Sequence, residues 1–274
     1  MTPCGQLSRE FQALWTNAAS YVERLGEGEL HWFKGRLSIP LYEHFSFRLG
    51  NRLFFVRLED SEGRLTAPGT MAGLLEISEA CAGVPLLMPM RSLGGIWLPS
   101  VPGWGLVEAR TREPVDPRGL VTSERVPLTD WELHDAAVKA VVRSLGGRKI
   151  ICSSSHPSIS PSVWFRGETG AEWVMVRAAL HPEADAQPPG NWAQIREACA
   201  ERGSGNGYFA VAVLAARDPE TGKASESVTL CRGDDPVVRI LQVPVYLKPA
   251  PPEDAQDTAV MNEAPESVTE ARAV

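Results

Sequence analysis

The chain has 274 residues, of which 43% are hydrophobic and 22% charged, and its formal net charge is −7. This is the composition of a globular protein that is long enough for two domains of ordinary size. The negative balance disfavours proteins that bind nucleic-acid phosphates through a basic face. The five cysteines are widely spaced and form no CxxC pair, which disfavours a disulfide framework and a zinc site.

The sequence carries no signal for membrane insertion or export. The first residues, MTPCGQLSREFQALW, contain no basic stretch followed by an apolar run, so we expect no signal peptide. No apolar run approaches the ~20 residues that a membrane-spanning helix needs. The histidines nowhere have metal-binding spacing. We therefore expect a cytoplasmic protein with no membrane partner, no metal and no cofactor.

The first part of the chain reads as a helix followed by strands. Apolar residues recur at helical spacing through residues 11–25, and Gly26 ends the pattern. A second helix contains the stretch ISEACA at 77–82. Gly50-Asn51 has the composition of a hairpin turn. The strands that we expect here lie at 30–37, in a hairpin at 45–58, at 85–90 and at about 104–110.

The same order of elements returns in the second part of the chain. Thr129 and Glu132 have the spacing of a capping box at the start of a helix, which Gly146-Gly147 ends. The stretch IREACA at 195–200 repeats ISEACA in five of six positions, 118 residues later. The strands that we expect here lie at 149–154, in a hairpin at 163–178, at 207–214 and at about 237–247.

We interpret this recurrence as an internal duplication, because a chance match of six residues would not bring the whole order of elements with it. The predicted fold class is α/β (α+β), made of two tandem α-β-β-β-α-β-β units. The predicted domains are a first unit at 1–110, a linker at 111–127, a second unit at 128–248 and a tail at 249–274. The tail is acidic and rich in proline, so we expect it to be disordered.

The second predicted hairpin resembles a known family motif. The stretch SPSVWFRGETGAEWVMVRAA at 160–179 is similar to the PD-(D/E)XK nuclease-like superfamily, which has an acid on one strand and acid-x-Lys on the next. The resemblance covers residues 129–214 and, less closely, 8–90. It implies a helix–three-strand–helix–strand core, and active members of the family hold Mg²⁺ through carboxylates.

The residues at the family's catalytic positions depart from its pattern. In the second unit, Ser162 and Met175 stand in place of the acids, and Arg177 stands in place of the lysine. Methionine offers no oxygen ligand to a hard cation, and arginine stays protonated. The resemblance therefore implies a pair of catalytically degenerate, pseudo-nuclease domains without a metal. The first unit carries His44, Phe55 and Arg57 at the corresponding positions.

These observations favour a non-enzymatic protein-interaction or scaffold protein whose partner is another protein. One alternative is a divergent metal-dependent nuclease that uses Glu168 or Glu172 as a relocated acid. Another is a partner-binding protein similar to the small acidic secretion chaperones of α-β-β-β-α-β-β type. Nucleic-acid binding through arginines is a third possibility, which the net charge disfavours. The candidate binding residues are Arg48, Arg57, Arg166, Arg177 and Trp164, and we assign no catalytic residue.

The sequence also predicts on which face of its sheet each of two arginines lies. Arg57 and Arg177 each follow a valine on equivalent strands, so each side chain points away from that valine. If the valine faces the second helix of its unit, the arginine lies in a concave site on the other face. A buried unpaired guanidinium is costly, so we expect each arginine to have a carboxylate or carbonyl partner or to be open to solvent.

Adjacent aromatic residues on one strand point to opposite faces of its sheet. Phe54-Phe55 and Trp164-Phe165 are such pairs, so each sheet needs a cover on both faces. The other unit or a partner protein would supply that cover, because interfaces are enriched in aromatic residues. We interpret RGD at 232–234 as a turn without a function, and CSSSH at 152–156 as serines that lead into a loop.

Overall fold

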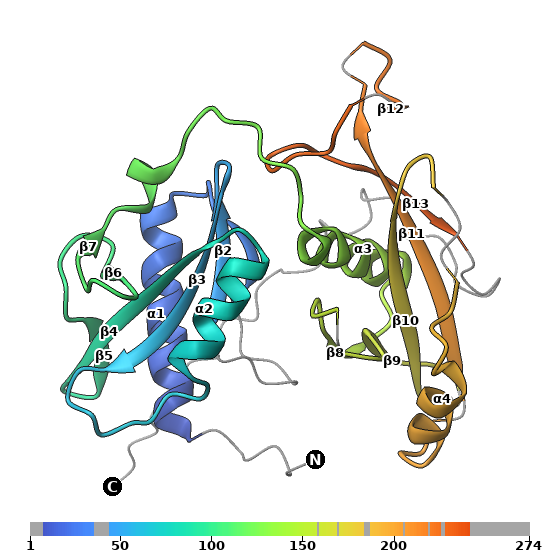
Figure 1. Cartoon of the computed structure of the whole chain (residues 1–274). Helices are drawn as coiled ribbons and strands as arrows, with labels where there is room; N and C mark the ends of the chain where they lie inside the picture. The colour runs from blue at the N-terminus through green and yellow to red at the C-terminus, as the bar shows by residue number, and fades with distance from the viewer. Residues whose placement is uncertain are drawn as a thin grey trace, which may run out of the picture.

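The computed structural model describes residues 8–35, 44–157, 159–168, 170–183, 187–204, 206–218, 220–225 and 228–241. In these residues the chain is a mixed α+β protein with two sheets and four α-helices, as predicted (Figure 1). None of the four helices is long and apolar enough to cross a membrane. The predicted tail at 249–274 lies outside the described residues.

The first half contains two helices and the larger sheet. Helix α1 (Arg9–Gly26) begins where the Ser8 side chain accepts a hydrogen bond from the Phe11 amide at 3.1 Å. Helix α2 (Met71–Ala80) follows the third strand. The sheet has the order β1-β2-β3-β4-β6-β7, and only β3 and β4 run parallel within it. Its strands are β1 (His31–Lys34), β2 (Phe45–Leu49), β3 (Arg52–Asp60), β4 (Val84–Leu93), β5 (Ile96–Pro99), β6 (Leu106–Glu108) and β7 (Pro114–Val115).

The second half contains the other two helices and a six-stranded sheet. Helix α3 (Asp130–Ser144) begins with the predicted capping box of Thr129 and Glu132. Helix α4 (Trp192–Ala200) contains the repeated hexapeptide. The sheet has the order β8-β9-β10-β11-β12, with β13 also paired to β11, and β10 runs parallel to β11. Its strands are β8 (Ile150–Ser153), β9 (Val163–Arg166), β10 (Ala171–Leu180), β11 (Gly207–Arg217), β12 (Ala224–Ser225) and β13 (Val237–Leu241).

The two halves share one order of elements. Each has a helix, three antiparallel strands, a helix, a strand parallel to the third and then an antiparallel strand. This order agrees with the elements predicted from the sequence, while duplication as its origin stays a prediction. The segment at 111–127 is more than a connection, because β7 and a 3-10 turn (Pro117–Leu120) lie in it.

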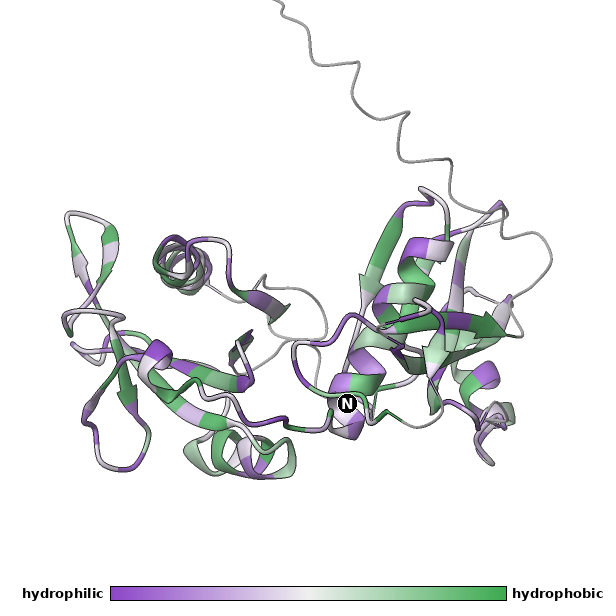
Figure 2. Cartoon of the chain, turned by 90° about the horizontal axis from the view of Figure 1, so that it is seen from above, coloured by the Kyte–Doolittle hydropathy of each residue, from purple (hydrophilic) through white to green (hydrophobic). Residues whose placement is uncertain are grey.

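Strand alternation gives each sheet two buried faces. On β3, Phe54 and Val56 pack in the core that α1 covers, and Leu53 and Phe55 pack on the side of α2. The second sheet follows the same rule: Phe165 belongs to the α3 core, and Trp164 packs with the cluster on the α4 side. Figure 2, seen from above, shows the hydrophobic residues concentrated on the strands of both halves.

This alternation corrects the expectation for the two arginines. Val56 and Val176 face the first helix of their halves, α1 and α3, and not the second helix. Arg57 and Arg177 are therefore on the faces that α2 and α4 cover, opposite to the predicted ones. Alternation in the sequence fixes which residues share a face, but it does not identify the helix that covers that face.

Trp131 covers part of the first sheet from the second half. It lies in the first turn of α3, and its ring centroid is 4.9 Å from that of Phe33 and 5.4 Å from that of Phe55. The indole is only 8% exposed. The other half thus supplies a cover for Phe55, as the pattern of adjacent aromatic residues predicted. Helix α3 lies on the side of its own sheet that faces the first half (Figure 1).

Candidate functional site

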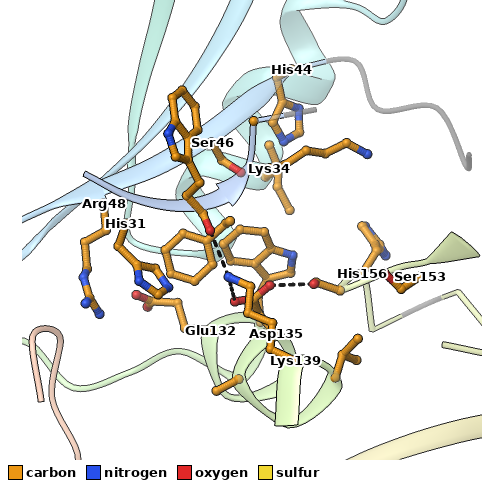
Figure 3. Close-up of a pocket in the computed structure, with 18 of the residues that line it drawn as sticks. His31, Lys34, His44, Ser46, Arg48, Glu132, Asp135, Lys139, Ser153 and His156 are labelled. Carbon is orange, nitrogen blue, oxygen red and sulfur yellow. Dashed lines mark hydrogen bonds and ion pairs between the residues drawn. The ribbon is translucent and has the colours of Figure 1, made fainter. Parts of the chain in front are cut away.

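A large cleft lies where the two halves meet. Its volume is about 2310 Å³, and both halves line it. The first half contributes parts of α1 and α2 together with β1 and the outer face of β2. The second half contributes α3, the loop after β8 and the turn that precedes β13 (Figure 3).

Asp135 on α3 organises the middle of the cleft. Its carboxylate is buried, with Lys139 Nζ 2.8 Å from one oxygen and Ser155 Oγ donating to the other at 2.5 Å. Burial raises the pKa of Asp135, although Lys139 and Ser155 act in the opposite direction. Lys139 also donates to the Trp32 carbonyl of β1 at 2.8 Å. This network therefore joins the two halves across the cleft.

Alternate residues of β2 form a polar stripe along the cleft. His44 lies just before the strand, and Ser46 and Arg48 lie on it, so the three share the face opposite Phe45 and Phe47. Figure 3 shows Arg48 at one end of the stripe and His44 at the other. Ser46 is 1% exposed, and its hydroxyl has no hydrogen-bond partner in the described part of the chain.

Burial changes the charge of the basic groups around this stripe. It lowers the pKa of Lys34 on β1 to about 7, because the ammonium is removed from water. It lowers the pKa of His44 to about 4, with Lys34 and His156 acting in the same direction. The pKa of His31 is also lowered to about 4, by burial first and then by Lys139 and Arg48. These imidazoles are therefore neutral at pH 7.

A buried ion pair closes the cleft on the side of α2. Arg232 donates to Glu132 of α3 and also to the carbonyls of Cys81 and Ala82, which directly follow α2. The sequence motif RGD thus contributes its arginine to the contact between the halves. Arg232 and Gly233 form a turn, as the sequence predicted, and the arginine side chain has a structural role that the sequence did not indicate.

Of the five predicted binding residues, the structure brings only Arg48 into the cleft. Arg57 lies 3.2 Å from Glu59 and donates to the Gly69 carbonyl at 3.4 Å, which agrees with the expectation for this arginine, while its Nε has no hydrogen-bond partner in the described part of the chain. Arg166 is exposed at the end of β9, and Arg177 is half-buried on β10. Trp164 packs in the cluster on the α4 side. These four do not form one site with Arg48.

The positions that resemble the nuclease motif are engaged in packing and local hydrogen bonds. Met175 is 1% exposed in the cluster below α4, and Ser162 accepts a hydrogen bond from the Val176 amide at 3.3 Å. Glu172 is 4% exposed and accepts from Tyr208 at 3.2 Å, and Glu168 is exposed in the hairpin turn. Within the described ranges, no three His, Cys, Asp or Glu residues are grouped so that they could hold a metal ion.

Comparison with known families gives one result. Residues 131–243 match the model of a domain of unknown function, DUF8840. The DUF8840 match begins at Trp131 and continues past β13, so it spans the elements of the second half. No curated protein and no solved structure matches the chain.

Reasoning from the sequence missed most of the cleft. It assigned no role to Trp131, Asp135 or Lys139, all of which lie on one helix. The spacing of Asp135 and Lys139 on that helix is the signal that could have indicated an ion pair. The contacts of this helix with the first half have no local signature, because their partners lie on β1 and β3.

Proposed function

We propose that this protein is a non-enzymatic protein-interaction protein that binds a polypeptide segment of a partner in the cleft between its halves. The size of the cleft carries the proposal. Pockets for small molecules usually enclose about 300–1,000 Å³. The cleft, at about 2310 Å³, is more than twice as large as that range, and its size suits a helix or an extended segment of a polypeptide.

The lining of the cleft has the chemistry of a protein-binding groove. Interfaces combine an apolar centre that is rich in aromatic residues with a polar rim. Here the lining combines apolar side chains from both halves with the polar stripe on β2 and the ion pair of Asp135 and Lys139. The apolar residues that line the cleft include Phe33, Ile77, Trp131, Val138, Val142 and Ile159.

Hydrogen bonding in the cleft favours binding over catalysis. A serine nucleophile needs a base that accepts its proton and is free to return it. Ser155 donates to Asp135, but Lys139 pairs with the other oxygen of this carboxylate and so makes it a weaker base. We further propose that both halves are degenerate nuclease-like units, because Met175 and Phe55, at the positions of the family's acids, pack in apolar clusters.

Photo-crosslinking tests the proposal directly. A benzoylphenylalanine side chain replaces Val142 or Ile159 in the cleft, and in the control it replaces Ile96, which is 59% exposed on β5. After irradiation in cells or lysate, we expect polypeptide adducts with the two cleft positions and none with the control. Cleft positions without adducts, or adducts of equal strength at Ile96, would contradict the proposal.

A further inference from the structure

The polar stripe on β2 presents hydrogen-bonding groups that no described residue pairs with. Ser46 and Arg48 lie two residues apart on the same face, so about 7 Å of strand separates them. In the described part of the chain, the Ser46 hydroxyl has no hydrogen-bond partner, and no residue accepts a hydrogen bond from the Arg48 guanidinium. A buried polar group without a partner costs free energy that a bound ligand can recover.

The carboxylates around Arg48 are held by other groups. Glu132 attracts Arg48 electrostatically, but its oxygens are hydrogen-bonded to Arg232 and Thr129. Asp135 is held by Lys139 and Ser155. The Arg48 guanidinium is half-buried and therefore partly removed from water, which lowers its pKa. Asp234 also attracts Arg48, and it is paired with Arg125 at 3.0 Å. In the described part of the chain, these carboxylates are therefore engaged by other groups and none is hydrogen-bonded to Arg48.

The planar guanidinium fork selects the chemistry of the missing ligand. Arginine binds carboxylates through two parallel hydrogen bonds, a geometry that a lysine ammonium cannot reproduce. The Ser46 hydroxyl can donate a further hydrogen bond to a backbone carbonyl or a second carboxylate. An acidic polypeptide segment that runs along β2 would satisfy both residues at once.

We propose that the cleft binds the chain's own acidic C-terminal segment, residues 249–274, with a carboxylate on Arg48. The segment has six acidic residues and one arginine. The described chain stops at Leu241 on β13, and Val238 of the same strand lines the cleft. The intervening residues can span roughly 25 Å when extended. A tethered segment has an effective concentration in the millimolar range, so a weak contact suffices. The acidic residues are Glu253, Asp254, Asp257, Glu263, Glu266 and Glu270.

This inference rests on the proposed function and adds regulation to it. A segment that is held on Arg48 competes with a partner polypeptide for the same cleft. Removing the segment then exposes the site, while the cleft itself is unchanged. When the acidic segment is removed, the affinity of the cleft for a partner segment should rise. The size of the rise equals the factor by which the bound acidic segment had lowered that affinity.

A binding experiment in trans tests the inference. A fluorescent peptide of residues 249–274 is titrated by anisotropy with the full chain and with a chain that ends at Lys248. We expect the peptide to bind the shortened chain at least tenfold more tightly, with an affinity that falls as salt is added. A peptide in which Gln and Asn replace the acidic residues should not bind. Failure to bind the shortened chain, or equal binding of the neutral peptide, would overturn the inference.

Matched variants of the shortened chain locate the site. Arg48→Ala should weaken peptide binding at least tenfold, and Arg48→Lys should weaken it several-fold because the fork is lost. Arg166→Ala is the control, because Arg166 has the corresponding position in the second half and is exposed outside the cleft. Equal losses in the Arg48 and Arg166 variants would overturn the inference, with circular dichroism confirming that both are folded.

The photo-crosslinking experiment keeps the two proposals apart. If the shortened chain gives adducts from the cleft positions but does not bind the peptide, the partner-binding function stands and the role of the acidic segment is refuted. If the peptide binds at Arg48 but no partner adduct forms from the cleft, the function is refuted and the intramolecular contact remains.

Discussion

Arg232 and Glu132 form an ion pair in which both side chains are only 1% exposed. Arg232 Nε lies 2.9 Å from one Glu132 oxygen, and Nη2 lies 2.9 Å from the other. The same guanidinium donates to the carbonyls of Cys81 and Ala82 at 2.7 and 3.0 Å. A single side chain thus ties the end of α2 in the first half to the start of α3 in the second.

Removing Arg232 should destabilise the fold strongly. The variant Arg232→Ala leaves the Glu132 carboxylate buried without its cation, and breaking such a pair costs about 3–5 kcal/mol. The free energy of unfolding, measured with urea, checks this. Arg217→Ala is the control, because Arg217 pairs with Asp235 at 3.1 Å where both side chains are well exposed, and such pairs contribute about 0–1 kcal/mol. An equal loss of unfolding free energy in the two variants would refute the stabilising role of the buried pair.

Trp131 should hold the two halves together. The variant Trp131→Ala removes the indole that packs between Phe33 and Phe55, and truncating a buried tryptophan costs about 3–5 kcal/mol. We expect faster proteolysis between residues 110 and 127 and a larger radius of gyration by small-angle X-ray scattering. In Trp164→Ala, which changes packing within the second half alone, both quantities should stay near those of the unmodified chain.

Stability should fall in acid because of a buried histidine. Burial lowers the pKa of His134 to about 4, with Arg177 and His156 acting in the same direction. The unfolded chain binds this proton near pH 6.5, so between about pH 6.5 and 4 it binds a proton that the folded chain does not. The free energy of unfolding should therefore decrease as the pH falls through this window, and His31 and His44 should add to the decrease.

Replacing His134 isolates its share of this pH dependence. In His134→Leu the slope between pH 6 and 4.5 should become shallower by up to about 1.4 kcal/mol per pH unit. Above about pH 8 the slopes of the variant and the unmodified chain should agree, since His134 is then deprotonated in both the folded and the unfolded state. An unchanged slope in the acid window would show that the imidazole titrates normally in the folded chain.

The nuclease alternative has its own test. We expect no cleavage of DNA or RNA with Mg²⁺ or Mn²⁺, because Glu172 is hydrogen-bonded to Tyr208 and Met175 offers no oxygen ligand. The double variant Glu168→Gln/Glu172→Gln is the matched control. Metal-dependent cleavage that disappears in this variant would favour the divergent nuclease over the interaction protein.

Much of the secondary structure could be predicted because its signals are local. The apolar spacing of α1, the capping box of Thr129 and Glu132 and the turn at Gly50 each act within a few residues of the chain. Gly50 adopts a φ of 55°, a backbone conformation that favours glycine in a two-residue hairpin. These features place the elements without any information about tertiary contacts.

The cleft could not be predicted in the same way, because it depends on contacts between distant residues. Trp131 packs on Phe33, and Arg232 bonds to Glu132 and to the end of α2, but nothing in the spacing of these residues pairs them. Arg48 was selected because Phe47-Arg48 recurs as Phe165-Arg166 in the second half, not from knowledge of the cleft. The face of Arg57 was assigned wrongly because strand alternation does not identify the covering helix.

The central claim is that the cleft between the halves binds a partner polypeptide. Hydrogen–deuterium exchange on the complex with the cross-linked partner tests it most directly. The account predicts slower exchange in residues 31–34, 44–49 and 153–157, and unchanged exchange in 84–99. Protection confined to 84–99, with none in 44–49, would contradict the account.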